Sequence, residues 1–355
     1  MERKTATSEG RAPTISDVAR QANVSRATVS RAFGQPHLLS REMVAHVRAI
    51  ADRLGYVPNH TARALSTGKA GNLALLVPDI TNPFFASLMR GVQSKALSIQ
   101  YAIFLADSDE DPNLEDVLIA KLAAQVDGFI LASPRLPKKA LLQHAGRRTC
   151  VLINRDIPNF ARILVDGAKS YEEAVEHLAR LGHRAVAYLA GPRLSWSNGQ
   201  RLKAVLAAGM RHGVKIVQFA TDRPTFEAGE ACAAGLIESG TTAVLAYDDL
   251  LAQGIMAGLA RHGLTVPEDF SIVGCDGVLA TRTYPPLTSV AIGCRSAGEQ
   301  AVELLVDVMR GKSASGKRIV LPTELVIRAT TAKPRPAGRT DHAPALGSPT
   351  KTKAE

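Results

Sequence analysis

Residues 14–33 read TISDVARQANVSRATVSRAF and predict two short helices joined by a tight turn. Thr14 and Asp17 have the spacing of an N-terminal capping box, and Ser25 stands where it would cap the second helix. Asn23 lies between the helices and tolerates the left-handed backbone of a turn. Apolar residues recur at spacings of three and four, as on one face of a helix: Ile15, Val18, Ala19 and Ala22, then Val29, Ala32 and Phe33. The pattern predicts a helix-turn-helix, whose second helix enters the DNA major groove.

The predicted second helix presents mostly arginine and hydroxyl side chains to solvent. Arg26 and Arg31 carry forked donors that fit the O6 and N7 atoms of guanine. Short hydroxyls suit phosphate oxygens, and the helix offers three of them: Ser25, Thr28 and Ser30. An ordinary helical hairpin with a solvated basic face is the alternative, because a short apolar pattern is easily matched by chance.

The charge of the chain is unevenly distributed. Of its 355 residues, with a net charge of +10, residues 1–70 hold eleven Lys and Arg against five Asp and Glu, whereas residues 71–332 hold 27 against 26. Residues 333–355 hold five against two. A basic module on a nearly neutral body is typical of nucleic-acid-binding proteins, although basic termini are also common as solvated ends.

Composition narrows the class of protein further. A chain of this length predicts about two or three domains. The sequence has no apolar run long enough to span a membrane and no apolar core of a secretion signal near its start. Its four cysteines are scattered, with neither a CxxC pair nor the spacing of a zinc site. We therefore expect a cytoplasmic protein with reduced thiols, no membrane partner, no metal and no cofactor.

A third helix is predicted over residues 40–54, capped by Ser40 and ended by Gly55, which completes a headpiece over residues 13–57. Residues 58–70 are then a hinge helix and linker, in which a short helix begins at Asn59 and stops at Gly68. Such a helix is marginal in water unless something holds it. It would fold on DNA with Leu65 as an apolar wedge in the minor groove. A plain interdomain linker is the alternative.

The segments TISDVARQANVSRATVSRAF and LGYVPNHTARAL resemble the headpiece and hinge of the lactose-repressor family of bacterial transcription regulators. The resemblance continues through residues 14–330. It implies a homodimer on a pseudo-palindromic double-stranded operator, with Arg26, Ala27 and Arg31 facing bases and Leu65 inserted at the central step. Thr14 and Asn59, at the starts of the first helix and of the hinge helix, are assigned to the same interface.

From residue 72 short apolar runs alternate with helical stretches, as in parallel sheets with helices on both faces. The rhythm predicts an α/β domain of two lobes over residues 71–330. The first lobe comprises about 71–162 and 293–320, the second about 163–290 and 321–330. Residues 331–355, which are rich in Pro, Ala and Thr, are predicted to be a disordered basic tail. The tail has no apolar heptads, which favours a dimer over a tetramer.

Ligands of such sheets bind beyond the carboxyl ends of the strands. Polar and aromatic side chains follow several predicted strands, and we expect them to form a cleft for a sugar-like polyol. They are Asp79, Phe84, Phe85, Asn154, Arg155, Trp196, Arg201, Asp248 and Asp276. Taken singly, each is also explained as a surface-loop residue or a helix cap, as is Asp249 before the helix 250–262.

The body is also similar to the periplasmic sugar-binding fold that the family uses as its effector domain. The resemblance implies a ligand cleft lined by Asp79, Phe84, Phe85, Arg201, Asp248 and Asp276, while the loops around Asn154, Arg155 and Trp196 differ in length. Two positions depart from the family pattern. Cys294 stands where an aromatic residue is common, and Asp248 stands where Asn is frequent.

These features predict a sequence-specific DNA-binding repressor controlled by a small sugar-like effector, and not an enzyme. An exported solute-binding receptor would share the body but would need a signal peptide. A sugar kinase would need a nucleotide site, and the near P-loop GKSASGKR (311–318) ends in Arg, without the hydroxyl that binds Mg²⁺.

Overall fold

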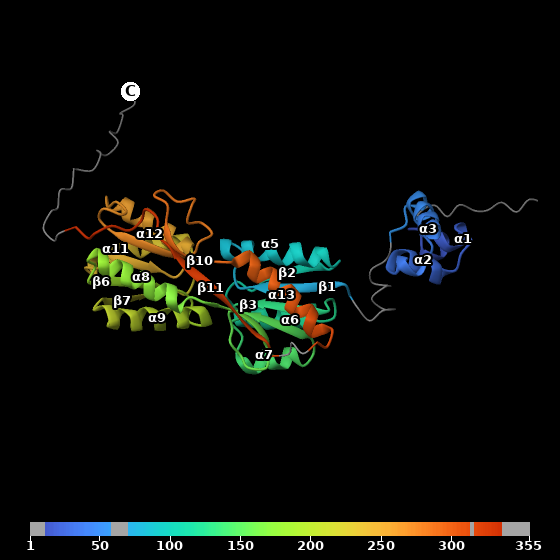
Figure 1. Cartoon of the computed structure of the whole chain (residues 1–355), viewed down its shortest axis with the longest axis horizontal. Coiled ribbons are helices and arrows are strands. Elements are labelled where there is room, and N and C mark those ends of the chain that lie inside the picture. The colour runs from blue at the N-terminus through green and yellow to red at the C-terminus, as the bar shows by residue number, and fades with distance from the viewer. Residues whose placement is uncertain (1–10, 58–69, 313–315, 336–355) are drawn as a thin grey trace, which may run out of the picture. The chain divides into compact units, whose positions relative to one another are not determined.

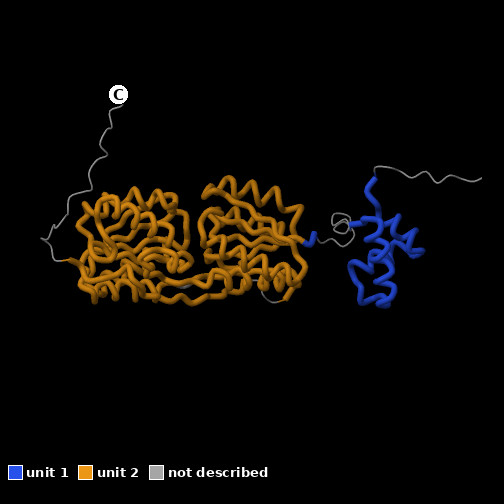
Figure 2. Tube along the Cα trace, turned by 90° about the horizontal axis from the view of Figure 1, so that it is seen from above, with its two compact units in different colours: residues 1–71 blue, residues 72–355 orange. Residues whose placement is uncertain are grey.

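A computed structural model describes residues 11–57, 70–312 and 316–335. The chain divides into two compact units, residues 1–71 and residues 72–355 (Figure 2). Each unit is described separately below. Among the described residues, no helix has both the length and the apolar character needed to cross a membrane.

Over its described residues 11–57, the first unit is a bundle of three α-helices with a short 3-10 turn: α1 (Ile15–Gln21), α2 (Arg26–Gly34), the turn Pro36–Leu38 and α3 (Arg41–Leu54). Its caps follow the predictions. Asp17 accepts hydrogen bonds from the backbone N–H and the hydroxyl of Thr14, at 2.9 and 2.6 Å. Ser25 accepts from the backbone N–H of Thr28 at 3.0 Å, and Gly55 ends α3 in the left-handed conformation. Buried apolar residues from all three helices hold the bundle together.

The first lobe of the second unit is a parallel sheet with helices on both faces (Figure 1). Its strand order is β2-β1-β3-β4-β5, and the strands are β1 (Asn72–Val77), β2 (Ala102–Asp107), β3 (Gly128–Ala132), β4 (Thr149–Ile153) and β5 (Ala161–Asp166). One face packs against α5 (Pro83–Ser98) and α13 (Cys294–Met309). The other face packs against α6 (Pro112–Leu122) and α7 (Lys138–Ala145).

The second lobe repeats this architecture. Its strand order is β10-β9-β8-β6-β7, and the strands are β6 (Ala185–Ala190), β7 (Lys215–Ala220), β8 (Ala243–Ala246), β9 (Ser271–Asp276) and β10 (Thr288–Ile292). Helices α8 (Ala168–Leu181) and α9 (Trp196–His212) cover one face. The other face is covered by α10 (Phe226–Ala231), α11 (Ala233–Glu238) and α12 (Asp249–Arg261).

One strand belongs to both sheets. The first half of β11 (Arg318–Val326) pairs parallel with β5, from Arg318 opposite Arg162 to Pro322 opposite Asp166. Its second half pairs antiparallel with β10, from Thr323 opposite Ile292 to Val326 opposite Ser289. The two lobes are thereby joined edge to edge, and parallel pairing is seen between all other neighbouring strands of the described sheet.

Two boundaries differ from the sequence predictions. Residues 163–166, expected in the second lobe, lie in β5, which pairs with β4 and so completes the sheet of the first lobe. Residues 331–335, expected to begin a disordered tail, dock on the second lobe. The backbone N–H of Ala332 donates to Ser271 at 3.0 Å, and the His183 ring contacts the Ala332 carbonyl at 2.9 Å. These backbone contacts order the segment although its sequence has no periodicity.

Candidate DNA interface and ligand cleft

Helix α2 exposes the side chains predicted to contact DNA. Arg26, Ala27, Ser30 and Arg31 are exposed, whereas Val29 and Ala32 are fully buried in the headpiece core. The Ser25 hydroxyl caps the helix and lies 2.9 Å from the Thr28 hydroxyl. The exposed face therefore combines two guanidinium groups with short side chains that allow close approach to a DNA groove.

Three other predicted contacts differ in status. Thr14 is half-buried, and its hydroxyl donates to Asp17, so its first role is to cap α1. Asn59 and Leu65 lie outside the described residues.

The second unit brings most of the predicted ligand residues into one cleft between its lobes. Seven predicted residues line it: Asp79, Phe84, Phe85, Asn154, Arg201, Asp248 and Asp276. They come from strand ends and helix starts in both lobes. Asn154 and Asp276 both have positive φ angles, of 53° and 98°, directly after β4 and at the end of β9. Such backbone strain in non-glycine residues is typical of ligand sites, where it sets the direction of a side chain.

The centre of the cleft is a buried ion pair in the second lobe. Arg201, at 8% exposure, lies 3.4 Å from the carboxylate of Asp276 and donates to the backbone carbonyl of Tyr247. Its guanidinium also stacks over the Tyr247 ring, 4.7 Å from the centroid. Burial raises the pKa of Asp276 well above its usual range, and the Arg201 charge partly offsets that shift. The guanidinium of Arg201 is thus already engaged by groups of the protein itself.

Asp248 links the two lobes. It caps α12 by accepting from the backbone N–H of Leu251 at 2.8 Å, and it accepts from the Asn82 side chain of the first lobe at 2.9 Å. Burial raises the pKa of Asp248 from 3.8 to about 7. Asp249, which the sequence suggested as the cap, instead accepts from Ser289 and from the backbone N–H of Leu279.

The first lobe contributes an aromatic wall and an acidic group. Phe84 and Phe85, at the start of α5, are buried and meet edge to face with centroids 5.0 Å apart. The Oδ1 atom of Asp79 accepts from the backbone N–H and the hydroxyl of Thr81. This half-buried carboxylate is thereby held at the cleft.

Sequence analysis missed further lining residues, among them Arg135, Glu110, Ser133, Ser197, Pro224 and Tyr247. Arg135 is buried and is held by both carboxylate oxygens of Glu110 and by the Ser133 carbonyl. Behind it, burial raises the pKa of Glu115 to about 7, although the carboxylate accepts the backbone N–H groups of Arg135 and Leu136. The signal for this set was available, since Ser133 and Arg135 directly follow the strand 128–132.

Three residues considered at the sequence level lie elsewhere. Arg155 lines neither this cleft nor the pocket beside it, and its guanidinium reaches the Leu136 carbonyl at 3.5 Å. Trp196 lines the neighbouring pocket instead. Cys294 is buried in the core of the first lobe. Neither Arg155 nor Trp196 is among the residues that line the cleft in this structure, and their assignment to the ligand site stays a prediction.

The fold and cleft define a class of protein: a helix-turn-helix headpiece attached to a two-lobed ligand-binding body. Residues 14–59 match the family model "Bacterial regulatory proteins, lacI family", and residues 175–331 match "Periplasmic binding protein-like domain". The chain is 31% identical to the HTH-type transcriptional repressor CytR of Escherichia coli K12 over 332 residues, covering 90% of this chain and 96% of that protein. It is 33% identical to catabolite control protein A of Streptococcus mutans over 330 residues, covering 90% and 98%.

Comparison with solved structures indicates the same family. The lac repressor dimer bound to operator and the anti-inducer ONPF superposes with a TM-score of 0.81 at 25% identity, covering 91% of this chain and 100% of that one. A complex of the transcriptional regulator CelR with cellobiose has a TM-score of 0.67 at 28% identity, covering 90% and 99%. The chain belongs to the lacI family of bacterial transcription regulators. The predicted fold class and family are thereby confirmed.

Proposed function

We propose that this regulator represses transcription as a homodimer on operator DNA, and that a small neutral sugar-like ligand in the interlobe cleft changes its operator affinity. The observation that carries the proposal is the cleft itself, in which carboxylate, amide and phenyl groups from both lobes converge. Such groups accept and donate to hydroxyls beside flat apolar faces, as polyol binding requires. A regulator bound to bacterial DNA works in the cytoplasm.

The charges of the cleft favour a neutral ligand over a phosphorylated one. Both of its arginines are already engaged, Arg135 with Glu110 and Arg201 with Asp276. Asp79 adds a further carboxylate. An anionic ligand would meet these carboxylates without a free cation, whereas sugar hydroxyls would donate to them. The CelR complex with cellobiose supports the same ligand class, as does a LacI family transcriptional regulator from Enterococcus faecium with bound ribose, which has a TM-score of 0.68 at 26% identity.

Ligand binding is coupled to the DNA-binding unit through the angle between the lobes. The lobes touch directly where Asn82 meets Asp248 and where Arg223 pairs with Asp109. A ligand shifts this arrangement only if it prefers one angle over another. A coupling of about 1–3 kcal/mol would change operator affinity roughly 5–150-fold.

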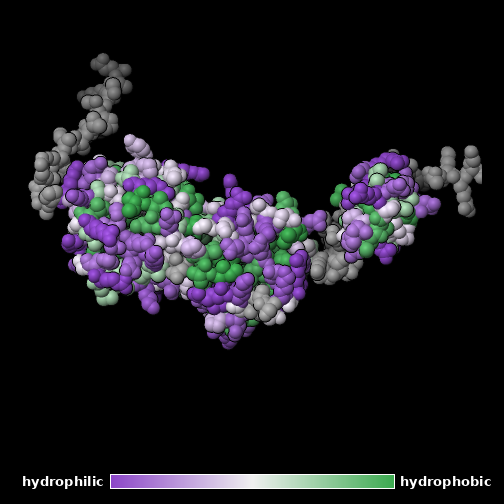
Figure 3. All heavy atoms as spheres, in the orientation of Figure 1, coloured by the Kyte–Doolittle hydropathy of each residue, from purple (hydrophilic) through white to green (hydrophobic). Residues whose placement is uncertain are grey.

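The dimer surface we propose lies on the first lobe. Strand β2 is an edge strand, and Phe104 and Leu105 on it are 39% and 40% exposed. Leu97 on α5 is 73% exposed, and Leu114 and Val117 on α6 are 37% and 44% exposed. Figure 3 shows hydrophobic residues gathered in patches within the mainly hydrophilic surface of the second unit. Apolar patches beside an unpaired strand edge are typical of protein–protein contacts.

We assign binding and no catalytic step to this chain. The near P-loop segment follows α13 and precedes β11, which is the reverse of the strand–loop–helix order that holds nucleotide phosphates.

The test uses the full-length protein and DNA from upstream of its own gene. Binding is measured by fluorescence anisotropy at two salt concentrations, with and without ribose, glucose, cellobiose and glucose 6-phosphate. We expect tight, salt-dependent binding to this DNA and a change in affinity with at least one neutral sugar. Equal affinity for the upstream DNA and for random DNA would contradict the proposed sequence-specific binding. A response to the phosphorylated sugar alone would contradict the ligand class.

A further inference from the structure

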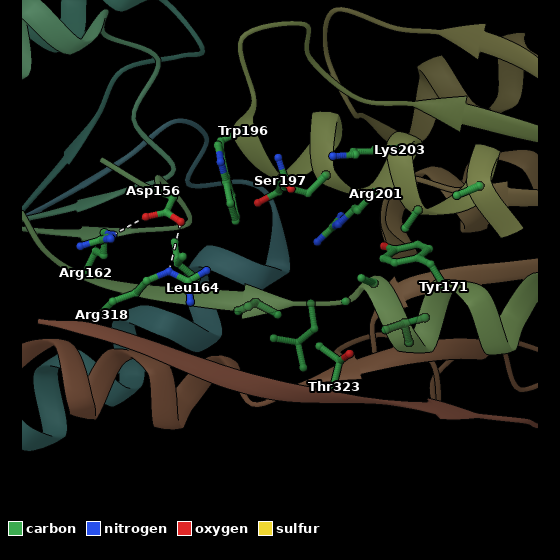
Figure 4. Close-up of a pocket in the computed structure, with 18 of the residues that line it drawn as sticks. Asp156, Arg162, Leu164, Tyr171, Trp196, Ser197, Arg201, Lys203, Arg318 and Thr323 are labelled. Atoms are coloured by element: carbon green, nitrogen blue, oxygen red, sulfur yellow. Dashed lines mark hydrogen bonds and ion pairs between the residues drawn. The ribbon is translucent and has the colours of Figure 1, made fainter. Parts of the chain in front are cut away.

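A second pocket lies beside the interlobe cleft, on the side where β5 and β11 cross between the lobes (Figure 4). Its volume is about 680 Å³, within the range of small-molecule sites. The first lobe contributes Asp156, Arg162 and Arg318, and the second contributes Tyr171, Trp196 and Lys203. Only Ser197 and Arg201 line both this pocket and the cleft.

The residues that line this side pocket carry a net positive formal charge, whereas those that line the cleft carry a net negative one. Asp156 is the one carboxylate among the described residues that line it, and it faces two guanidinium groups. Arg162 pairs with one oxygen of Asp156, and Arg318 pairs with the other at 3.1 Å. One carboxylate thus balances one of two arginines, and Lys203 adds a further positive charge on the wall formed by α9. The excess of positive charge favours an anionic ligand.

The remaining walls favour a ligand with a flat ring. Trp196 is half-buried and lies between the Asp156 cluster and Lys203 in Figure 4. Aliphatic side chains such as Leu164, Val165 and Ile292 line the pocket as well. An indole face and aliphatic walls bind planar rings by stacking and by burial of apolar surface.

The inner end of the pocket is formed by a buried tyrosine. Tyr171 is 2% exposed, and its phenol group lies beside the buried thiol of Cys275. In Figure 4 the phenol oxygen is turned toward Arg201, the residue shared with the cleft. The phenol therefore forms a buried polar end of the pocket, next to a residue that both sites share.

We propose that the side pocket is a second ligand site, for a small organic anion that carries a planar ring. A ligand there would contact both lobes next to the strands that join them and would hold one interlobe angle. Because Arg201 and Ser197 are shared, occupation of the pocket would also change the affinity of the cleft for its own ligand, and the change would be reciprocal.

The protein supplies its own reporter for a test, since Trp196 is the only tryptophan of the chain. Adenosine 5′-monophosphate and phenyl phosphate are titrated into the full-length protein while tryptophan emission is recorded. Adenosine, phenol and inorganic phosphate are the matched controls. We expect at least one of the two ring phosphates to change the emission with saturation below about 1 mM. We expect the neutral rings and inorganic phosphate to bind at least 10-fold more weakly.

Variants separate this site from the cleft. Arg318→Ala and Lys203→Ala should each weaken the ring phosphate at least 5-fold, whereas Lys139→Ala, an exposed lysine of α7 outside the pocket, should not. Asp79→Asn, which alters the cleft alone, should change sugar binding and leave the phosphate titration as it is. No saturable change with either ring phosphate, or equal affinity in all variants, overturns the proposal. Neither result bears on sugar binding in the cleft.

Discussion

The side-chain amide of Asn82 in the first lobe donates a 2.9 Å hydrogen bond to the carboxylate of Asp248 in the second. Both residues are buried, and each also caps a helix at the cleft, Asn82 for α5 and Asp248 for α12. This hydrogen bond joins the N-termini of two helices from different lobes, so it forms only when the lobes approach each other closely. Its acceptor is also the carboxylate whose pKa is raised to about 7.

The stability of the second unit should depend on pH through this carboxylate. Because its pKa is raised from 3.8 to about 7, the folded protein keeps a proton that the unfolded chain releases. The free energy of unfolding should therefore fall as pH rises from about 4 to about 7, and the loss should be complete above that range. In Asp248→Asn the change in Tm between pH 5 and pH 8 should be smaller than in the parent. An equal change in both proteins, measured by thermal denaturation, would rule out this role.

The effect of substituting Arg201 on the free energy of unfolding should depend on the charge of Asp276. Arg201→Met leaves the Asp276 carboxylate buried without its cation, which should cost about 3–5 kcal/mol of unfolding free energy. The double variant Arg201→Met/Asp276→Asn should recover part of that loss, because no unpaired charge remains. Urea denaturation of the two variants measures the difference. A double variant no more stable than Arg201→Met would show that an unpaired Asp276 charge is not what destabilises the single variant.

Ser25 should stabilise helix α2 through its cap. Ser25→Ala removes the hydrogen bond from the Thr28 backbone and should cost the headpiece about 1 kcal/mol. Ser25→Asp keeps a capping oxygen but adds a negative charge beside the proposed DNA surface. We therefore expect near-parental headpiece stability and weaker DNA binding in Ser25→Asp. Circular dichroism and anisotropy together check this separation of effects.

Arg31 should contact base edges in the DNA groove as well as phosphates. Its exposed guanidinium suits guanine, so Arg31→Ala should cost about 1–3 kcal/mol on the operator and relax base preference at one position. Arg53→Ala, at the last turn of α3, serves as a matched loss of charge in the headpiece. Equal losses on operator and on random DNA for Arg31→Ala would assign it to the backbone instead.

Alanine substitutions at two helical glycines, Gly91 and Gly199, should have different effects on the free energy of unfolding. A Cβ atom on Gly91 of α5 would lie 2.0 Å from the backbone oxygen of Arg295 in α13, so Gly91→Ala must push these helices apart. We expect a loss of about 1–3 kcal/mol. A Cβ on Gly199 of α9 meets nothing within 4 Å, and Gly199→Ala should be neutral or stabilise by up to about 1 kcal/mol. Chemical denaturation of both variants tests the contrast.

The sequence was most informative where local chemistry decides the structure. Thr14 with Asp17, Ser25 and Gly55 marked the ends of the headpiece helices, because caps involve residues three or four positions apart. The alternation of apolar runs and helices predicted the two-lobed α/β body for a similar reason. Each parallel strand is buried on both faces and reads as a short apolar run.

Contacts between distant segments were harder to predict. Strand 161–166 reads like any other apolar run, and only its pairing with β4 and β11 places it in the first lobe. Arg155 and Trp196 also follow strands, but the direction in which a loop turns its side chains is set by tertiary packing. Arg135 was missed because its sequence neighbours do not reveal Glu110, the partner that holds it at the cleft.

The shared strand β11 has a consequence for how the protein is made. Its pairing with both β5 and β10 means that the edge of each sheet stays open until residues 318–326 have left the ribosome. The headpiece core joins residues between Ile15 and Tyr56, which are synthesised before the second unit, so it can fold while the rest of the chain is still being translated. Nascent chains would thus carry a folded DNA-binding unit before either half of the sensor is complete.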